Sequence, residues 1–189
     1  MKFYYFVASL PALKLGEPSP LGQAEFRAEA ARLLPPDAVA ELEAVLGGDC
    51  GAARSGMAKC WFDAETQLRN AVATVRAGRL GVEAGPHLRP HRGFSASLEQ
   101  AVNEAYGKPN PLERELALDA QRWNVADDLS RATPFGLEAV LAYGLKLRMV
   151  ERWAGLQDEA GRVALQEAVQ QVRDRARAPE AATLTTAGA

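Results

Sequence analysis

The sequence predicts an all-α fold, and three observations support this prediction. Apolar residues recur at helical spacing along most of the 189-residue chain, prolines and glycines fall between these segments, and capping residues stand at several helix starts. The clearest start is Asn110-Pro111 with Glu113, which combines a capping side chain, a proline at the first helical position and an acid in the first turn. We expect a multi-helix bundle, built either as one body or as two small helical lobes.

The first half is expected to contain a short N-terminal element, a helical hairpin and a long helix. The aromatic residues 3–10 fit a strand or a buried helix equally, because periodicity does not distinguish the two over so few residues. Pro35-Pro36 separates the two hairpin helices, and Gly47-Gly48 ends the second of them. The helices expected in this half cover residues 21–34, 38–46 and 57–80.

Residues 85–93 are expected to divide the chain, because this basic stretch is interrupted by prolines and has no apolar stripe. The division gives an N-terminal helical half, 1–84, and a C-terminal helical half, 94–178. Thr133 and Pro134 predict the start of a helix that runs to Trp153, with threonine as the cap and proline at the first position. The other helices expected in the second half cover 97–107, 111–130 and 158–178, and the tail 179–189, which lacks an apolar face, is expected to be disordered.

Composition limits the classes of function. A net charge of −2 provides no general attraction for nucleic acid or for anionic membranes. Cys50 and Cys60 match no zinc-binding spacing and fit a reducing compartment. The N-terminus lacks the pattern of a signal peptide, and the uncharged run 139–145 is far shorter than the roughly 20 residues that cross a bilayer. A cytoplasmic protein without a transmembrane segment is expected.

The usual sequence signatures of enzymes and cofactor sites do not occur. The chain has no phosphate-binding G-x-x-x-x-G-K-[ST], no G-x-G-x-x-G, no G-x-S-x-G and no H-E-x-x-H. His87 and His91 are four residues apart, but Pro90 excludes the regular helix that would place both rings on one face. We therefore assign no catalytic residue, no metal site and no cofactor.

Asp119 is the most informative polar position. Helical spacing places this acid among Leu112, Leu116 and Trp123, on an apolar face of the helix 111–130. A buried carboxylate without a partner is costly, so a structural ion pair is expected. The candidate cations are Arg122, Lys146 and Arg69. The alternative function of Asp119 is that of a catalytic acid.

The helix expected from Thr133 to Trp153 is apolar around most of its circumference and must therefore be enclosed. Either the chain's own core covers it, or part of it forms an interface with another protein. Its charged end shows the i,i+3 and i,i+4 spacing of local ion pairs. The interface candidates are Leu141, Leu145, Arg148, Glu151, Arg152 and Trp153.

Four segments, residues 3–13, 61–81, 111–129 and 133–153, resemble a bacterial family whose genes accompany the subunits of V-type ATPases. The segment 134–143, with the pattern P-F-G-L-E-x-x-x-x-Y, is also similar to a pattern near the end of the V/A-type ATPase C subunit, which is known as d in eukaryotes.

The C subunit is an all-helical, funnel-shaped socket that receives the rotor axle and seats it on the membrane ring. It is considerably longer than this chain, so at most part of that architecture is expected here. The resemblance implies a non-catalytic central-stalk connector of a proton- or sodium-transporting V/A-type ATP synthase. Its partners would be the rotor subunits and the membrane ring, and it would associate peripherally with the membrane through protein contacts. The alternatives are an assembly or regulatory scaffold for the same complex and a carboxylate-based enzyme that uses Asp119.

Overall fold

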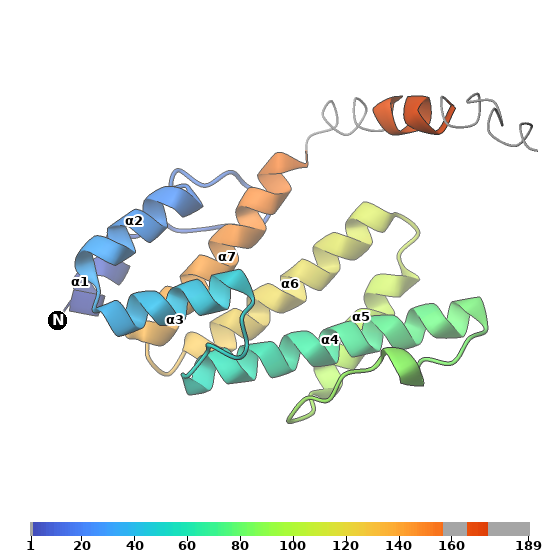
Figure 1. The fold of residues 1–189 in the computed structure, drawn as a ribbon, viewed down its shortest axis with the longest axis horizontal. Coiled ribbons are helices and arrows are strands. Elements are labelled where there is room, and N and C mark those ends of the chain that lie inside the picture. Colours follow the sequence, from blue (N-terminus) through green and yellow to red (C-terminus); the bar gives the residue numbers. More distant parts are fainter. Residues whose placement is uncertain (1, 157–165, 174–189) are drawn as a thin grey trace, which may run out of the picture.

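The computed structural model describes residues 2–156 and 166–173, and every regular element in these ranges is helical (Figure 1). This confirms the all-α prediction and shows that the N-terminal segment is a helix rather than a strand. The elements are α1 (Lys2–Ser9), α2 (Gln23–Leu33), α3 (Pro36–Gly47), α4 (Gly56–Leu80), the 3-10 helix η1 (Gly85–His87), α5 (Ala96–Gly107), α6 (Pro111–Ser130) and α7 (Leu137–Gly155). Residues 166–173 are also helical, and the predicted tail 179–189 lies outside the described residues.

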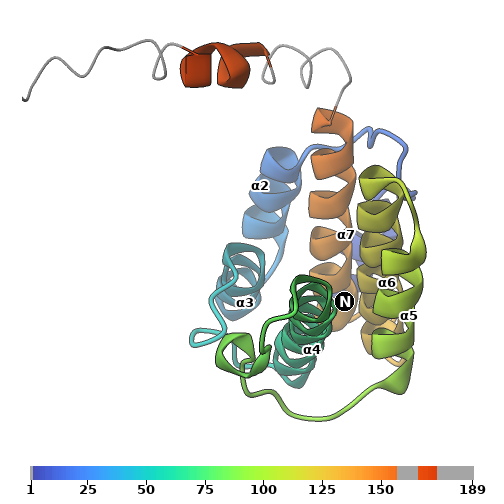
Figure 2. The same ribbon diagram turned by 90° about the vertical axis from the view of Figure 1, so that its right-hand side faces the viewer.

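One hydrophobic core is built around α7, which packs against α1, α2, α3 and α6 (Figure 2). The side chains of Phe6 and Phe26 stack with their ring centroids 5.7 Å apart, and both are buried. Gly144 lets α7 approach closely, because a Cβ atom there would lie 3.1 Å from side-chain atoms of both Leu42 and Phe26. The mainly apolar circumference of α7 is thus covered largely by the chain itself.

A second hydrophobic cluster lies among α4, α5 and α6. It contains Leu68 from α4, Val102 from α5 and Leu118 from α6, all buried. The long helix α4 takes part in both clusters, because its Trp61 belongs to the core around α7. Helix α4 therefore connects the two cores.

The connector between α4 and α5 runs back along α4. Asn70 forms two hydrogen bonds with the backbone of Arg89, and Gln67 forms two with the backbone of Ser95. These side-chain bonds return the chain to the middle of α4, where α5 begins. The expected division into halves at residues 85–93 stays a prediction, and α4 from the first half packs on α5 and α6 from the second.

Local capping chemistry explains several helix ends. The Asn110 side chain accepts a hydrogen bond from the backbone N–H of Leu112 at 2.9 Å, as the Asn-Pro signal predicts. Gly48 follows α3 with φ +75°, a left-handed conformation that favours glycine.

Helix α7 begins at Leu137, so the predicted start at Thr133 and Pro134 is wrong. The N–H of Gly136 bonds to the carbonyl of Thr133 at 3.0 Å, which makes a turn of the segment before the helix. The Thr133 hydroxyl donates to the carboxylate of Glu138 rather than accepting from the first helical turn. The threonine-proline pair therefore shapes the turn between α6 and α7.

Glu41 connects α3 to the start of α4. Its carboxylate accepts hydrogen bonds from the backbone N–H groups of Arg54 and Ser55, the nearest at 2.8 Å, and the residue is 5% exposed. Burial raises the pKa of Glu41, but the hydrogen bonds from Ser55 and Arg54 outweigh it, so the pKa lies below its usual value. An anion placed before a helix N-terminus also interacts favourably with the helix dipole.

Glu41→Gln is expected to lower the free energy of unfolding by about 1–3 kcal/mol near neutral pH, because it weakens hydrogen bonds to a buried charge. The pKa of Glu41 is depressed in the folded state. Its stabilisation is therefore present above the unfolded pKa, about 4.3, and is lost as the pH falls through the folded value. Urea unfolding at several pH values measures the difference in the free energy of unfolding between Glu41→Gln and wild type.

The control is Glu43→Gln on the same helix, where the ion pair with Arg27 is exposed and contributes little to stability. A difference between Glu41→Gln and wild type that grows on acidification would contradict the assignment.

Candidate functional site

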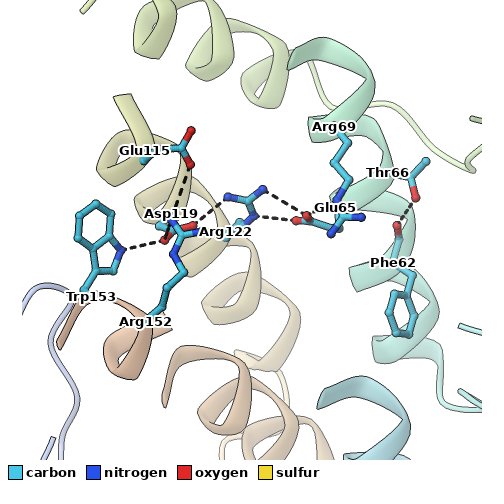
Figure 3. Close-up of polar contacts among 9 residues, drawn as sticks. All are labelled: Phe62, Glu65, Thr66, Arg69, Glu115, Asp119, Arg122, Arg152 and Trp153. Carbon is cyan, nitrogen blue, oxygen red and sulfur yellow. Dashed lines mark hydrogen bonds and ion pairs between the residues drawn. The ribbon is translucent and has the colours of Figure 1, made fainter. Parts of the chain in front are cut away.

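The candidate site is a charged network where α4, α6 and α7 meet (Figure 3). At its centre is Asp119 on α6, which is 2% exposed. Its Oδ1 atom accepts a hydrogen bond from Arg122 at 2.8 Å, and its Oδ2 atom accepts from the indole N–H of Trp153 at 2.8 Å. Arg152 lies 2.9 Å from the same Oδ2 atom. Both carboxylate oxygens are therefore occupied.

The burial of Asp119 comes from α7 rather than from its own helix face. Leu112 and Leu116, which were expected to enclose it, are 54% and 40% exposed. The cover is provided by Trp153 and Arg152, which approach from the end of α7. The expectation of a buried α6 stripe at this position is thus corrected, because the stripe faces outward over the first turns of α6.

Glu65 on α4 is the second carboxylate of the network. Arg122 donates two hydrogen bonds to it, at 2.8 and 3.2 Å, and Arg69 donates one at 2.7 Å. Burial raises the pKa of Glu65, but Arg122 and then Arg69 outweigh this effect, so the pKa lies below its usual value. Arg122 bridges Glu65 and Asp119, and these two anions raise its own pKa against the effect of burial. The network therefore crosslinks three helices.

The three candidate cations for Asp119 occupy different positions. Arg122 is paired with Asp119, as the i,i+3 spacing predicts. Arg69 belongs to the same network but is paired with Glu65. Lys146 is instead paired with Asp127, and its ammonium lies 5.0 Å from the centroid of the Trp123 ring, so its expected role beside Asp119 is corrected. Lys146 lies seven residues before Trp153 on α7, about two helical turns away along the axis, where it meets Asp127, eight residues after Asp119 on α6.

Leu141 and Leu145, expected at an interface with another protein, are fully buried in the chain's own core. This corrects their assignment: the helices packed around α7 cover the face that carries them.

The charged end of α7 is exposed but makes contacts within the chain. Arg148 donates to the backbone carbonyl of Leu46 at 2.8 Å, and Glu151 accepts from the backbone N–H of Gln23 at 2.5 Å. Arg152 is paired with Asp119 and lies 3.6 Å from Glu115. These charges therefore face solvent and also contact other parts of the chain. Sequence spacing alone missed the contribution of Arg152 and Trp153, because they meet Asp119 only through the packing of α7 on α6.

Both oxygens of Asp119 are in contact with donors, Oδ1 with Arg122 and Oδ2 with Trp153 and Arg152, and these contacts join α6 to α7. Within residues 2–156 and 166–173, no group of three or more His, Cys, Asp and Glu side chains is arranged to hold a metal ion. Cys50 and Cys60 are exposed free thiols. In the part of the chain that the structure describes, no helix combines the length and the apolar character needed to cross a membrane.

Comparison with known proteins gives one family. Residues 96–176, less than half of the chain, match the family described as "Protein of unknown function (DUF2764)". The matched region includes α5, α6 and α7, and therefore Asp119, Arg122, Arg152 and Trp153. No curated protein and no solved structure gave a match. The chain is thus similar, over its C-terminal helices, to a family whose description names no activity or partner.

Proposed function

We propose that the chain is a non-catalytic connector of a V/A-type rotary ATPase, a component that resembles the C subunit and joins the rotor axle to the membrane ring. It would act in the cytoplasm and associate with the membrane sector through protein contacts. The proposal is supported by the resemblance of four segments to the family that accompanies V-type ATPase subunits. The structural observation that carries it is the presence of two distinct exposed surfaces at opposite ends of the long axis.

The first surface, here called the aromatic end, consists of Tyr4 and Tyr5 on α1 and Phe135 in the turn before α7. These side chains are 53%, 69% and 49% exposed. The ring of Tyr4 lies 4.7 Å from that of Phe135 and 5.8 Å from that of Tyr5, centroid to centroid. Clustered exposed aromatic residues are typical of protein-binding hot spots. Helix α1 lies at the left end of the molecule in Figure 1.

The second surface, the basic end, surrounds Tyr106 at the end of α5. The guanidinium carbons of Arg76, Arg79 and Arg114 lie 6.0, 5.0 and 4.6 Å from the centroid of its ring, and Lys108 follows two residues later. Among the described residues, none of these four cations has a carboxylate within ion-pair distance. The C-terminal end of α4, which carries Arg76 and Arg79, lies at the right end of Figure 1.

A connector needs two separate contact surfaces, and these two differ in chemistry. The basic end fits an acidic surface of one partner, because its arginines, which among the described residues bond only to the Tyr106 hydroxyl and to backbone carbonyls, have no carboxylate partner there and would favour carboxylates and steer association. The aromatic end fits an apolar surface of another partner. An assembly or regulatory scaffold for the same complex would use the same surfaces transiently. The carboxylate-enzyme alternative is less well supported, because Asp119 is bonded on both oxygens.

The experiment is affinity purification of the tagged full chain from native membranes, with the partners identified by mass spectrometry. The wild type is expected to recover ATPase rotor and ring subunits. Tyr5→Ala with Phe135→Ala should lose one partner, and Arg79→Glu with Lys108→Glu should lose the other. The control is Arg32→Glu on α2, an exposed residue outside both surfaces, and thermal unfolding establishes that each variant is folded. Recovery of only partly assembled complexes would favour the scaffold, and failure of the wild type to recover any ATPase component would overturn the proposal.

A further inference from the structure

A pocket of about 390 Å³ lies where the end of α3, the middle of α4, the α4–α5 connector, α6 and α7 come together. Part of its wall is apolar and includes Trp61, Phe62 and Met149. Its charged lining consists of one carboxylate, Glu65, and four arginines: Arg69, Arg89, Arg122 and Arg148. This is an unusual concentration of positive charge for a chain whose net charge is −2.

Two of these arginines have no carboxylate partner. Glu65 is already shared by Arg122 and Arg69, and Arg122 is also bonded to Asp119. Arg148 donates to the carbonyl of Leu46 and makes no ion pair in the described part of the chain. The guanidinium of Arg89 has neither a hydrogen bond nor an ion pair within residues 2–156 and 166–173, since its bonds involve the backbone alone. The pocket therefore presents two cations that protein anions do not neutralise.

The surroundings of Arg148 are unfavourable for its charge. Arg148 is exposed as a residue, but the partial burial of its guanidinium lowers its pKa, and repulsion from Arg122 and Arg69 acts in the same direction against the attraction of Glu65 and Asp119. A bound anion would offset both effects. A guanidinium also presents donors in a planar fork that matches the oxygens of a carboxylate or phosphate.

We propose that this pocket binds a small organic anion: an oxyanion group held by Arg89 and Arg148, attached to an apolar body that packs on Trp61, Phe62 and Met149. The pocket combines two features of ligand sites, an apolar wall and a few polar groups in its lining. The oxyanion is a carboxylate or a phosphate, since both match the arginine fork. This inference is independent of the ATPase proposal, because it concerns a pocket apart from the aromatic and basic ends.

Isothermal titration calorimetry on the full chain tests the proposal. Phenyl phosphate and benzoate are the two probes, and comparison of their affinities shows which oxyanion is preferred. Inorganic phosphate lacks the apolar body, and benzyl alcohol lacks the charge. Saturable binding of at least one aromatic anion is expected, with weaker binding of inorganic phosphate and none of benzyl alcohol. No saturable binding of either aromatic anion, or equal affinity for inorganic phosphate and phenyl phosphate, would overturn the proposal.

Two variants assign the binding to the pocket. Arg89→Met removes a guanidinium without bonds, so the fold is expected to be unchanged, and the affinity should fall about tenfold, a loss typical of a charge-assisted hydrogen bond. Arg148→Met provides a second, independent measurement and should produce a similar loss. The matched control is Arg32→Met, which removes a positive charge on α2 and should leave the affinity unchanged. Unchanged affinity in both pocket variants would place the binding elsewhere and contradict the assignment.

Discussion

Asp119→Ala is expected to lower the free energy of unfolding by about 3 kcal/mol, near the lower end of the range of roughly 3–5 kcal/mol for breaking a buried ion pair. The variant leaves the indole N–H of Trp153 without its acceptor and removes one anion from Arg122. Two features keep the loss at the lower end. Arg122 retains Glu65, and the side chain of Arg152 is 46% exposed and regains water.

Chemical denaturation monitored by circular dichroism measures this change, with Asp128→Ala as the matched control. Asp128 is on the same helix, but its pair with Arg131 is exposed, so its removal should change the stability by less than about 1 kcal/mol. Asp119→Asn keeps the shape of the side chain and one acceptor oxygen. Its free energy of unfolding should therefore lie between those of wild type and Asp119→Ala. Equal denaturation midpoints for Asp119→Ala and Asp128→Ala would show that the network contributes no net stability.

The parts of the fold that could be predicted depend on neighbouring residues in the sequence. The Asn110-Pro111 start and the Gly47-Gly48 stop use side chains and backbone conformations within one helical turn, so the signal and the structure coincide. Thr133-Pro134 carries a similar signal, yet α7 begins at Leu137. The packing of α7 on α6 requires a turn there, and that requirement is not local.

The network at Asp119 could be predicted only in part, for the same physical reason. The pair with Arg122 follows from i,i+3 spacing on one helix. The bond to Trp153 joins residues 34 positions apart, and Arg122 meets Glu65 across 57 positions. Helical periodicity indicates which face a residue occupies, but it does not indicate which helix covers that face. Arg89 and Arg148, 59 positions apart, likewise come to line one pocket only through the fold.

Leu141→Ala is expected to lower the free energy of unfolding by about 2–5 kcal/mol, because it removes buried methyl groups and leaves a cavity in the core around α7. This prediction separates a core residue from the interface residue that the sequence suggested. An interface leucine would be exposed in the isolated chain, and its truncation would weaken partner binding with little effect on folding.

Leu112→Ala on α6 is the control, since Leu112 is 54% exposed and the same number of atoms is removed. Leu112→Ala is expected to change the free energy of unfolding by less than roughly 0.5 kcal/mol, as surface substitutions in general do. The denaturation midpoints of the two variants, measured under identical conditions, show whether Leu141 is a core residue or an interface residue. A Leu141→Ala protein as stable as Leu112→Ala would mean that the core around α7 rearranges to fill the space left by this side chain. A much less stable one would show that Leu141 serves the chain's own core rather than a contact with a partner.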